Sequence, residues 1–242
     1  MRRKFSWVIT VILFVICSLF GCTKKEDIHL GNVLIFGDSY STFTNYIPDG
    51  YKSWYSRTAG YTDVNNVKET WWHQLVNRTH STLMLNSSYS GSTICHTGYD
   101  GADFSDISFV GRMTALFSQT EFQKEKVDTV IIYGGLNDYW ANAPLGELIY
   151  ENFTPQDLYS VYPAFTYLLS NLKSNLPNAR IIVIIEELLG QEMKENFALA
   201  CQQLSVEYIQ PQNISKKNSH PDLVGMDQLT NQIIEYLKTK SI

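Results

Sequence analysis

The chain has 242 residues, of which 44% are hydrophobic and 18% charged, and its 24 acidic side chains outnumber the 19 basic ones. This is the composition of an ordinary globular protein, and with 13% aromatic residues it excludes a disordered chain. A net charge of -5 without a basic run excludes a nucleic-acid binder that works by neutralising phosphates. A chain of this length can bury its core as a single domain.

The first 22 residues have the three-part pattern of a secretory signal. Basic residues at positions 2–4 are followed by an apolar run over 5–20 and then by Gly21 and Cys22. An apolar run of about 16 residues is shorter than the roughly 20 that a transmembrane helix needs, so a membrane-anchor helix is the weaker alternative. The segment from Leu19 to Cys22 resembles the lipobox of bacterial lipoproteins, in which the cysteine is lipidated and becomes the new N-terminus.

That resemblance implies a signal peptide over 1–21, a lipidated tether over 22–31 and a folded domain over 32–242. It places the protein in the bacterial cell envelope, attached to the outer membrane through its lipid anchor only, on the periplasmic or the outer face. A lysine followed by two acidic residues at 25–27 resembles the surface-export signal of Bacteroidetes lipoproteins. Cys95 and Cys201 are then the only cysteines of the folded domain, either bridged or as two buried thiols.

From residue 32 the chain alternates short β-branched runs with longer segments of helical period. Apolar runs, which favour buried parallel strands, occupy residues 33–36, 83–85, 129–133, 180–185 and 206–209. Apolar residues spaced three and four apart predict helices over 69–78, 107–117, 155–176, 191–204 and 221–238. Five strands alternating with five helices predict an α/β fold, a three-layer α/β/α sandwich around a five-stranded parallel sheet.

Reactive and polarising groups follow these apolar runs. Ser39 comes just after the first run, Gly91 after the second and Asn137 after the third, and His220 stands at the start of the last helix. Ligands of parallel sheets bind at the carboxyl ends of the strands, so these groups are expected at one edge. A serine hydroxyl needs a base within hydrogen-bond reach to become a nucleophile, and histidine has the pKa for that task.

The four segments resemble the four blocks of the SGNH hydrolases, also called the GDSL esterase and lipase family, over residues 32 to about 238. The resemblance implies a flavodoxin-like fold and a serine esterase with Ser39 as nucleophile and His220 as base. The N–H groups of Ser39 and Gly91 and the side-chain amide of Asn137 would form its oxyanion hole. No cofactor or metal is expected, since the sequence has neither a nucleotide-binding motif nor zinc-ligand spacing. The oligomeric state is left open.

One position departs from the family pattern. Members of the family usually have an aspartate three residues before the catalytic histidine, where this chain has Lys217. A lysine cannot accept the imidazole N–H. Three alternatives stay open: a Ser–His pair oriented by a backbone carbonyl, a carboxylate from Glu186 or Glu187 after the fourth strand, or an inactive enzyme. Asp222 is expected to cap the last helix instead.

The long connection over residues 40–68 bears on the substrate. Its aromatic side chains between Phe43 and Tyr61 could stack on sugar rings or pack against the sheet, and it has few branched aliphatic residues. This favours an ester substrate that is a small molecule or a glycan, with O-acetyl groups on carbohydrate as the expected target. Two alternatives are a lipase or lysophospholipase and a catalytically inactive glycan-binding lipoprotein.

Overall fold

The computed structural model describes residues 28–240. The signal peptide predicted over 1–21 and the predicted lipidation of Cys22 therefore lie outside the described residues. Within 28–240, no helix is both long enough and apolar enough to cross a membrane.

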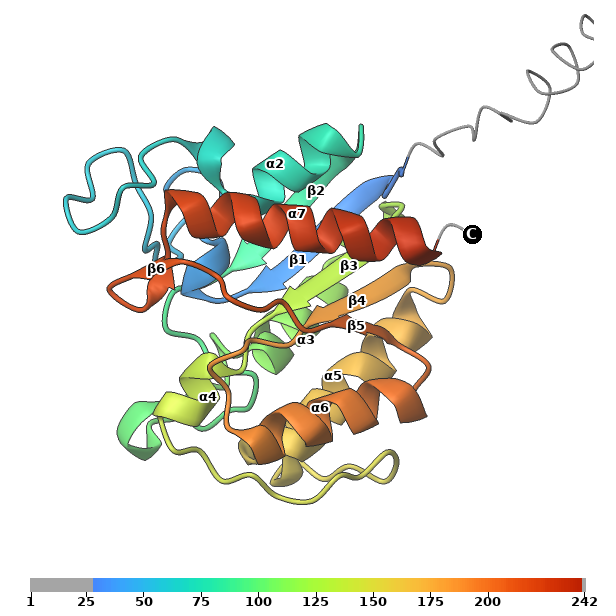
Figure 1. The fold of residues 1–242 in the computed structure, drawn as a ribbon. Helices are drawn as coiled ribbons and strands as arrows, with labels where there is room; N and C mark the ends of the chain where they lie inside the picture. The colour runs from blue at the N-terminus through green and yellow to red at the C-terminus, as the bar shows by residue number, and fades with distance from the viewer. Residues whose placement is uncertain (1–27, 241–242) are drawn as a thin grey trace, which may run out of the picture.

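A five-stranded sheet forms the centre of the fold (Figure 1). Its strands are β1 (Asn32–Gly37), β2 (Thr82–Ser88), β3 (Thr129–Tyr133), β4 (Arg180–Ile184) and β5 (Glu207–Ile209). They are all parallel and lie in the order β2-β1-β3-β4-β5, which is the flavodoxin-like order. The predicted strands are thus confirmed, with small differences at their ends.

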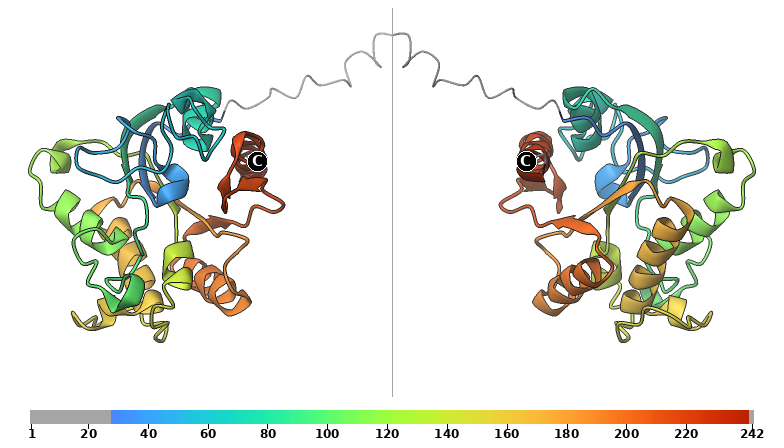
Figure 2. Two further views of the ribbon diagram at one scale, coloured as in Figure 1. Left: turned by 90° about the vertical axis from the view of Figure 1, so that its left-hand side faces the viewer. Right: turned by 90° about the vertical axis from the view of Figure 1, so that its right-hand side faces the viewer.

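Helices cover both faces of this sheet. On one face lie α2 (Trp71–Arg78) and α7 (Leu223–Lys240), and on the other lie α3 (Phe109–Phe117), α5 (Val161–Asn175) and α6 (Gln191–Gln203) (Figures 1 and 2). This arrangement confirms the predicted three-layer sandwich. The 3-10 helices are η1 (Ser39–Ser41), η2 (Val67–Glu69), η3 (Tyr99–Gly101), η4 (Phe122–Lys124) and η5 (Asp157–Tyr159).

Helix α5 begins at Val161, six residues later than the predicted start at 155. The Asp157 carboxylate accepts both the N–H and the hydroxyl of Thr154, at 2.7 Å each, and closes a separate turn there. Ser160 then has an extended backbone (φ -116°, ψ 145°), so the helix can start only after it. The predicted helix boundary was wrong because a local side-chain bond competes with the helical period.

The start of the last helix was also predicted too early. His220 and Pro221 form the short strand β7, which pairs with β6 (Lys216–Lys217) in a separate hairpin. Asp222 then accepts the Gly225 N–H at 2.8 Å and caps α7, as expected from the sequence. A further helix, α4 (Leu136–Trp140), was missed because five residues are too few to show a helical period.

The core lies between the sheet and its helices. All five residues of β3 are buried, and Phe165 of α5 stacks on Phe197 of α6 with ring centroids 4.1 Å apart. Cys95 and Cys201 are buried free thiols, so the second of the two alternatives for these cysteines holds. Burial raises the pKa of Cys201 to about 12.

Strands β1, β2 and β3 end level with one another. Gly37, the last residue of β1, pairs with Ser88 of β2 on one side and with Tyr133 of β3 on the other. The segments that follow these strands therefore start at the same edge, beside the point where the strand order reverses. That is the place where parallel sheets of this order bind their ligands.

Candidate active site

Ser39 lies in the tight turn that follows β1. A Cβ atom on Gly37 would come within about 2.6 Å of the Ser41 and Ser88 side chains, so the strand can turn here only with glycine. Asp38 caps the short helix η1 by accepting the Tyr40 N–H at 3.0 Å. Burial raises the pKa of this carboxyl group to about 7. The turn leaves Ser39 only 5% exposed at the edge of the sheet.

His220 reaches the same edge from the hairpin of β6 and β7. Asn218 and Ser219 form its two-residue turn, and both have positive φ (50° and 61°), as a type I′ turn requires. Two tyrosine hydroxyls hold the hairpin in place: Tyr40 donates to the Ser219 carbonyl, and Tyr55 donates to the Pro221 carbonyl at 2.7 Å. As a result β7 lies beside η1, the helix that carries Ser39 (Figure 2).

The two side chains form a hydrogen-bonded pair. His220 Nε2 is 2.9 Å from Ser39 Oγ, and His220 Nδ1 is 2.9 Å from the Asn218 carbonyl oxygen. A carbonyl oxygen only accepts, so the neutral ring carries its proton on Nδ1 and leaves Nε2 to accept the Ser39 hydroxyl proton. Burial lowers the pKa of His220 to about 4, although the bond to Asn218 partly opposes this shift. The ring is therefore neutral near pH 7 and in the tautomer that a general base needs.

Of the alternatives left open for the partner of His220, the structure has the backbone carbonyl at Nδ1 and not a carboxylate from Glu186 or Glu187. Glu186 accepts the Tyr133 hydroxyl at 2.5 Å and pairs with Lys216 at 3.1 Å. Glu187 pairs with Lys216 at 2.7 Å and accepts the backbone N–H of Asn213 at 2.7 Å. Both carboxylates are thus bonded to residues that precede His220 or lie at its hairpin. The acceptor of the His220 Nδ1–H is the Asn218 backbone carbonyl.

Gly91 follows β2 and has a left-handed backbone conformation (φ 87°). A Cβ atom there would have no neighbour within 4 Å, and the left-handed conformation is one that glycine adopts without strain. Across residues 28–240, the N–H groups of Gly91 and Ser39 have no hydrogen-bond acceptor. Both predicted backbone donors are thus without an acceptor among these residues, as the predicted oxyanion hole requires.

Asn137 lies in α4, directly after β3. Its Nδ2 donates to the Ser92 carbonyl at 3.0 Å and, through a longer bond of 3.3 Å, to the Asp38 carboxylate. Its Oδ1 accepts the Tyr99 hydroxyl at 2.7 Å, which fixes the direction of the amide. The third predicted donor therefore lies beside the Ser39 turn. Tyr99 was missed because nothing in the sequence links it to a residue 38 positions away.

A second group that sequence reasoning missed is Arg112 of α3, which is 2% exposed. Its guanidinium donates to the carbonyls of Gly37 and Ser87 and to the Ser92 hydroxyl, so it joins the ends of β1 and β2 to the loop that carries Gly91. It forms no ion pair in the described part of the chain. Burial lowers its pKa to about 10, which leaves it charged at neutral pH.

The long connection over residues 40–68 lies over the Ser–His pair. The Trp54 indole stacks on the His220 imidazole, with ring centroids 3.6 Å apart and an angle of 5° between the planes. Phe43 and Tyr55 are buried, and Tyr51 packs against Tyr89 with centroids 5.3 Å apart. Most aromatic residues of this connection therefore pack within the protein, and only Tyr46 and Tyr61 are exposed, at 43% and 45%.

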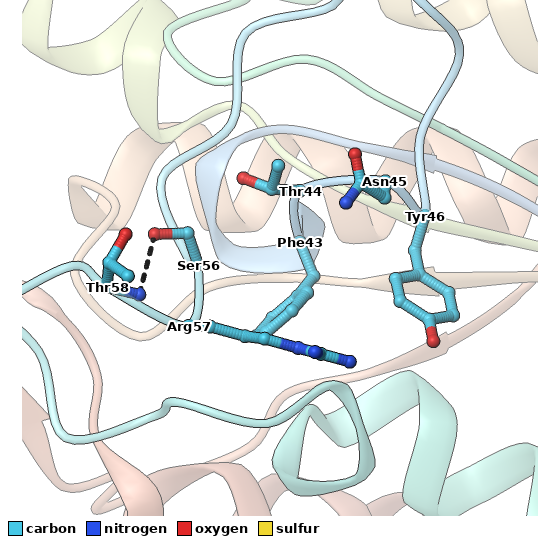
Figure 3. Close-up of a pocket in the computed structure, with 7 residues that line it drawn as sticks. All are labelled: Phe43, Thr44, Asn45, Tyr46, Ser56, Arg57 and Thr58. Atoms are coloured by element: carbon cyan, nitrogen blue, oxygen red, sulfur yellow. Dashed lines mark hydrogen bonds between the residues drawn. The ribbon is translucent and has the colours of Figure 1, made fainter.

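A cavity of about 430 Å³ opens on the connection itself (Figure 3). It is lined by Phe43, Thr44, Asn45, Tyr46, Ser56, Arg57 and Thr58. Figure 3 shows the Arg57 side chain extended alongside the Phe43 ring, toward the side on which Tyr46 lies. Neither Ser39 nor His220 lines this cavity, so it is separate from the Ser–His pair.

The fold, with a Ser–His pair at the edge where the strand order reverses, defines an α/β protein of the serine ester hydrolase class. The family model described as GDSL-like Lipase/Acylhydrolase matches residues 31–237. The chain therefore belongs to this family and is an enzyme of the SGNH/GDSL type.

Solved structures agree with this membership. A GDSL-like lipase from Bacteroides ovatus is 38% identical, with a TM-score of 0.81 over 87% of this chain and 99% of the other. One from Bacteroides uniformis is also 38% identical, with a TM-score of 0.79 over 86% and 96%. An acetyl xylan esterase from Butyrivibrio proteoclasticus is 14% identical and shares the fold alone, with a TM-score of 0.57 over 88% and 64%. No match was found among proteins of curated function.

Proposed function

We propose that the protein hydrolyses O-acetyl and other short acyl esters of carbohydrates, with Ser39 as nucleophile and His220 as general base. The observation that carries this proposal is the 2.9 Å contact between His220 Nε2 and Ser39 Oγ, in the tautomer that lets Nε2 accept a proton. A resting serine hydroxyl is a weak nucleophile, and this contact is what activates it.

The reaction proceeds in two halves. Ser39 Oγ attacks the ester carbonyl carbon while its proton passes to His220 Nε2. When the tetrahedral intermediate collapses, Nε2 returns that proton to the departing alcohol oxygen and leaves an acyl-enzyme on Ser39. Water then attacks the acyl carbon while His220 Nε2 takes its proton. When the second tetrahedral intermediate collapses, Nε2 gives that proton to Ser39 Oγ and the carboxylic acid leaves, which restores the resting enzyme.

The charge that develops on the carbonyl oxygen is stabilised by three donors. The N–H groups of Ser39 and Gly91 have no other acceptor in residues 28–240 and are available directly. Asn137 contributes through Nδ2, whose 3.3 Å bond to Asp38 is the longer of its two and gives way to the oxyanion. Removal of one such donor costs about 10²–10³-fold in kcat.

A rim of exposed aromatic side chains supports a carbohydrate substrate. Tyr99 is bonded to Asn137, and Tyr139 and Trp140 follow Asn137 in α4. Each of these three side chains is at least 36% exposed. Flat aromatic faces beside polar groups match the apolar faces and hydroxyls of a sugar ring. These residues form the carbohydrate rim of the proposed site.

A substrate panel on the domain without residues 1–22 tests this proposal. Acetate release from an acetylated xylo-oligosaccharide should exceed fatty-acid release from a lysophospholipid, and Ser39→Ala should abolish both. Preferred release of the fatty acid would support the alternative lipase. Trp140→Ala should raise KM for the oligosaccharide and leave p-nitrophenyl acetate hydrolysis unchanged. Binding of the oligosaccharide without any turnover by the wild type would favour the glycan-binding alternative.

We further propose that the enzyme is a lipoprotein of the bacterial cell envelope, lipidated on Cys22 after removal of residues 1–21. The support is the order of basic, apolar and cysteine-containing segments at the start of the chain. Expression of the full chain and of Cys22→Ser in cells fed radioactive palmitate tests this. The wild type should carry the label and Cys22→Ser should not, and an unlabelled wild type or equal labelling of the two would contradict lipidation of Cys22.

A further inference from the structure

The closest partner of the His220 ring, apart from its two hydrogen bonds, is the indole of Trp54. The rings are almost parallel, at 5°, with centroids 3.6 Å apart, so the whole imidazole face is covered. The buried indole Nε1–H has no hydrogen-bond acceptor in residues 28–240. Ring contacts, and not a polar bond of its own, therefore set the orientation of the indole.

The backbone around Trp54 ties it to both members of the Ser–His pair. Its N–H donates to Thr42 Oγ1 at 2.9 Å, and that hydroxyl donates to the Ser39 carbonyl at 3.0 Å. Its carbonyl accepts the Tyr61 hydroxyl at 2.6 Å, and the Tyr61 ring packs on the indole with centroids 4.7 Å apart.

Asn218 links this set of contacts to His220. Its Nδ2 donates to the Tyr61 carbonyl at 2.8 Å, while its own carbonyl receives the His220 Nδ1–H. Trp54 is therefore fixed relative to both the nucleophile and the base.

No carboxylate contacts His220 within the described part of the chain. The titratable groups that face its ring are the phenols of Tyr40 and Tyr55, with centroids at 5.1 and 6.4 Å, and both hydroxyls donate to backbone carbonyls. Lys217 pairs with His220 across the hairpin and is exposed. A protonated His220 thus has one carbonyl dipole at Nδ1 and the indole on its face.

We infer that Trp54 is a positioning residue that takes over part of the role of the missing aspartate, by holding the imidazole in place and stabilising the imidazolium through its π face. This inference rests on the proposed function, since the imidazolium forms when Nε2 takes the Ser39 proton. The face of an indole attracts a cation most strongly where water is excluded, and His220 is 7% exposed.

Substitutions of Trp54 separate this role from simple packing. Trp54→Leu keeps an apolar side chain but removes the π face, and it should lower kcat for p-nitrophenyl acetate about tenfold with little change in KM. Trp54→Phe should recover part of that loss. Tyr46→Leu is the matched control, because Tyr46 belongs to the same connection and does not contact His220; it should leave kcat unchanged. Unchanged kcat in Trp54→Leu would overturn the inference.

Fluorinated tryptophans at position 54 keep the shape of the ring and weaken its π face stepwise. Log kcat should fall with each added fluorine, and equal kcat across the series would overturn the inference even if Trp54→Leu failed to fold. The pKa of His220, followed by NMR, should fall by about half a unit across the series. This readout needs no turnover. A wild type without esterase activity would therefore refute the proposed function, while the titration still decides the role of Trp54.

Discussion

The Asn218 carbonyl oxygen accepts the Nδ1–H of His220 at 2.9 Å and so replaces the carboxylate that other family members place there. The acceptor lies two residues before the histidine, in a turn whose residues both have positive φ. A hairpin turn thus presents a backbone carbonyl where Lys217 supplies no acceptor. The tautomer of His220 is therefore set by a main-chain carbonyl. No side-chain substitution removes this acceptor directly.

Glu186→Gln and Glu187→Gln should each leave kcat within about threefold of the wild type, because neither carboxylate reaches Nδ1. Each should lower Tm, since Lys216 loses one of its two ion-pair partners. Steady-state kinetics and thermal unfolding on the same samples check both effects. A loss of kcat near the roughly 10⁴-fold that follows removal of a triad aspartate would show that a carboxylate acts on His220 after all.

The pH profile of kcat/KM should have its acidic limb near pH 4, well below the usual range for histidine. Burial lowers the pKa of His220 to about 4, so the neutral base persists on acidification until that pH. Asp38→Asn serves as the control, because the Asp38 carboxyl is bonded to Asn137 and has a pKa of about 7. A limb between pH 6 and 7 that persists in this variant would mean that the ring is hydrated in the active enzyme.

The same shift affects stability. Between about pH 6.5 and pH 4 the unfolded chain binds a proton at His220 that the folded chain does not, so unfolding becomes easier as pH falls. Thermal unfolding of the wild type and of His220→Gln, which cannot titrate, should show the larger drop in Tm for the wild type between pH 7 and pH 5.

Several parts of this site were predictable from the sequence, because they depend on local pattern. The apolar runs gave the strands, and the turn residues after them placed Ser39, Gly91 and Asn137 at one edge. The group that accepts the His220 Nδ1–H could not be predicted, and the sequence left a backbone carbonyl and a carboxylate as alternatives. Its identity depends on the backbone geometry of Asn218 and Ser219, which neither residue type dictates.

Long-range contacts account for the other omissions. Trp54 reaches His220 across 166 positions only because the connection folds back over the hairpin, and Tyr99 and Arg112 meet the site through helices whose packing is a tertiary property. Periodicity reports the local environment of a residue and not its distant partners. The two helix starts that were wrong, at 155 and 221, failed for a related reason, since side-chain bonds and strand pairing there override the helical pattern.

Tyr99→Phe should lower kcat by roughly three- to tenfold, with KM for p-nitrophenyl acetate unchanged. The lost hydroxyl is the donor that fixes Asn137 Oδ1, and one hydrogen bond of this kind contributes about 1 kcal/mol. The phenyl ring keeps the aromatic surface, so binding of a sugar should be retained. Equal kcat in both proteins would mean that the bonds of Asn137 to Ser92 and Asp38 hold the amide adequately.

Arg112→Met should destabilise the protein by about 3 kcal/mol or more, since it leaves the carbonyls of Gly37 and Ser87 and the Ser92 hydroxyl without their donor in the interior. Urea unfolding measures this loss. Arg78→Met is the control, because Arg78 contacts Asn231 and Asp227 at the protein surface, and it should change stability by less than about 0.5 kcal/mol. Similar losses for the two variants would contradict a structural role for the buried guanidinium.

The central claim is that Ser39 becomes acylated with His220 as its base, and mass spectrometry of the acyl-enzyme tests it most directly. Rapid acid quenching of the enzyme with p-nitrophenyl acetate should give a protein heavier by one acetyl group, located on the peptide that contains Ser39. Ser39→Ala should show no adduct, and His220→Gln should form it much more slowly. An acetyl group on another residue of the wild type, or an adduct of equal yield in Ser39→Ala, would contradict the account.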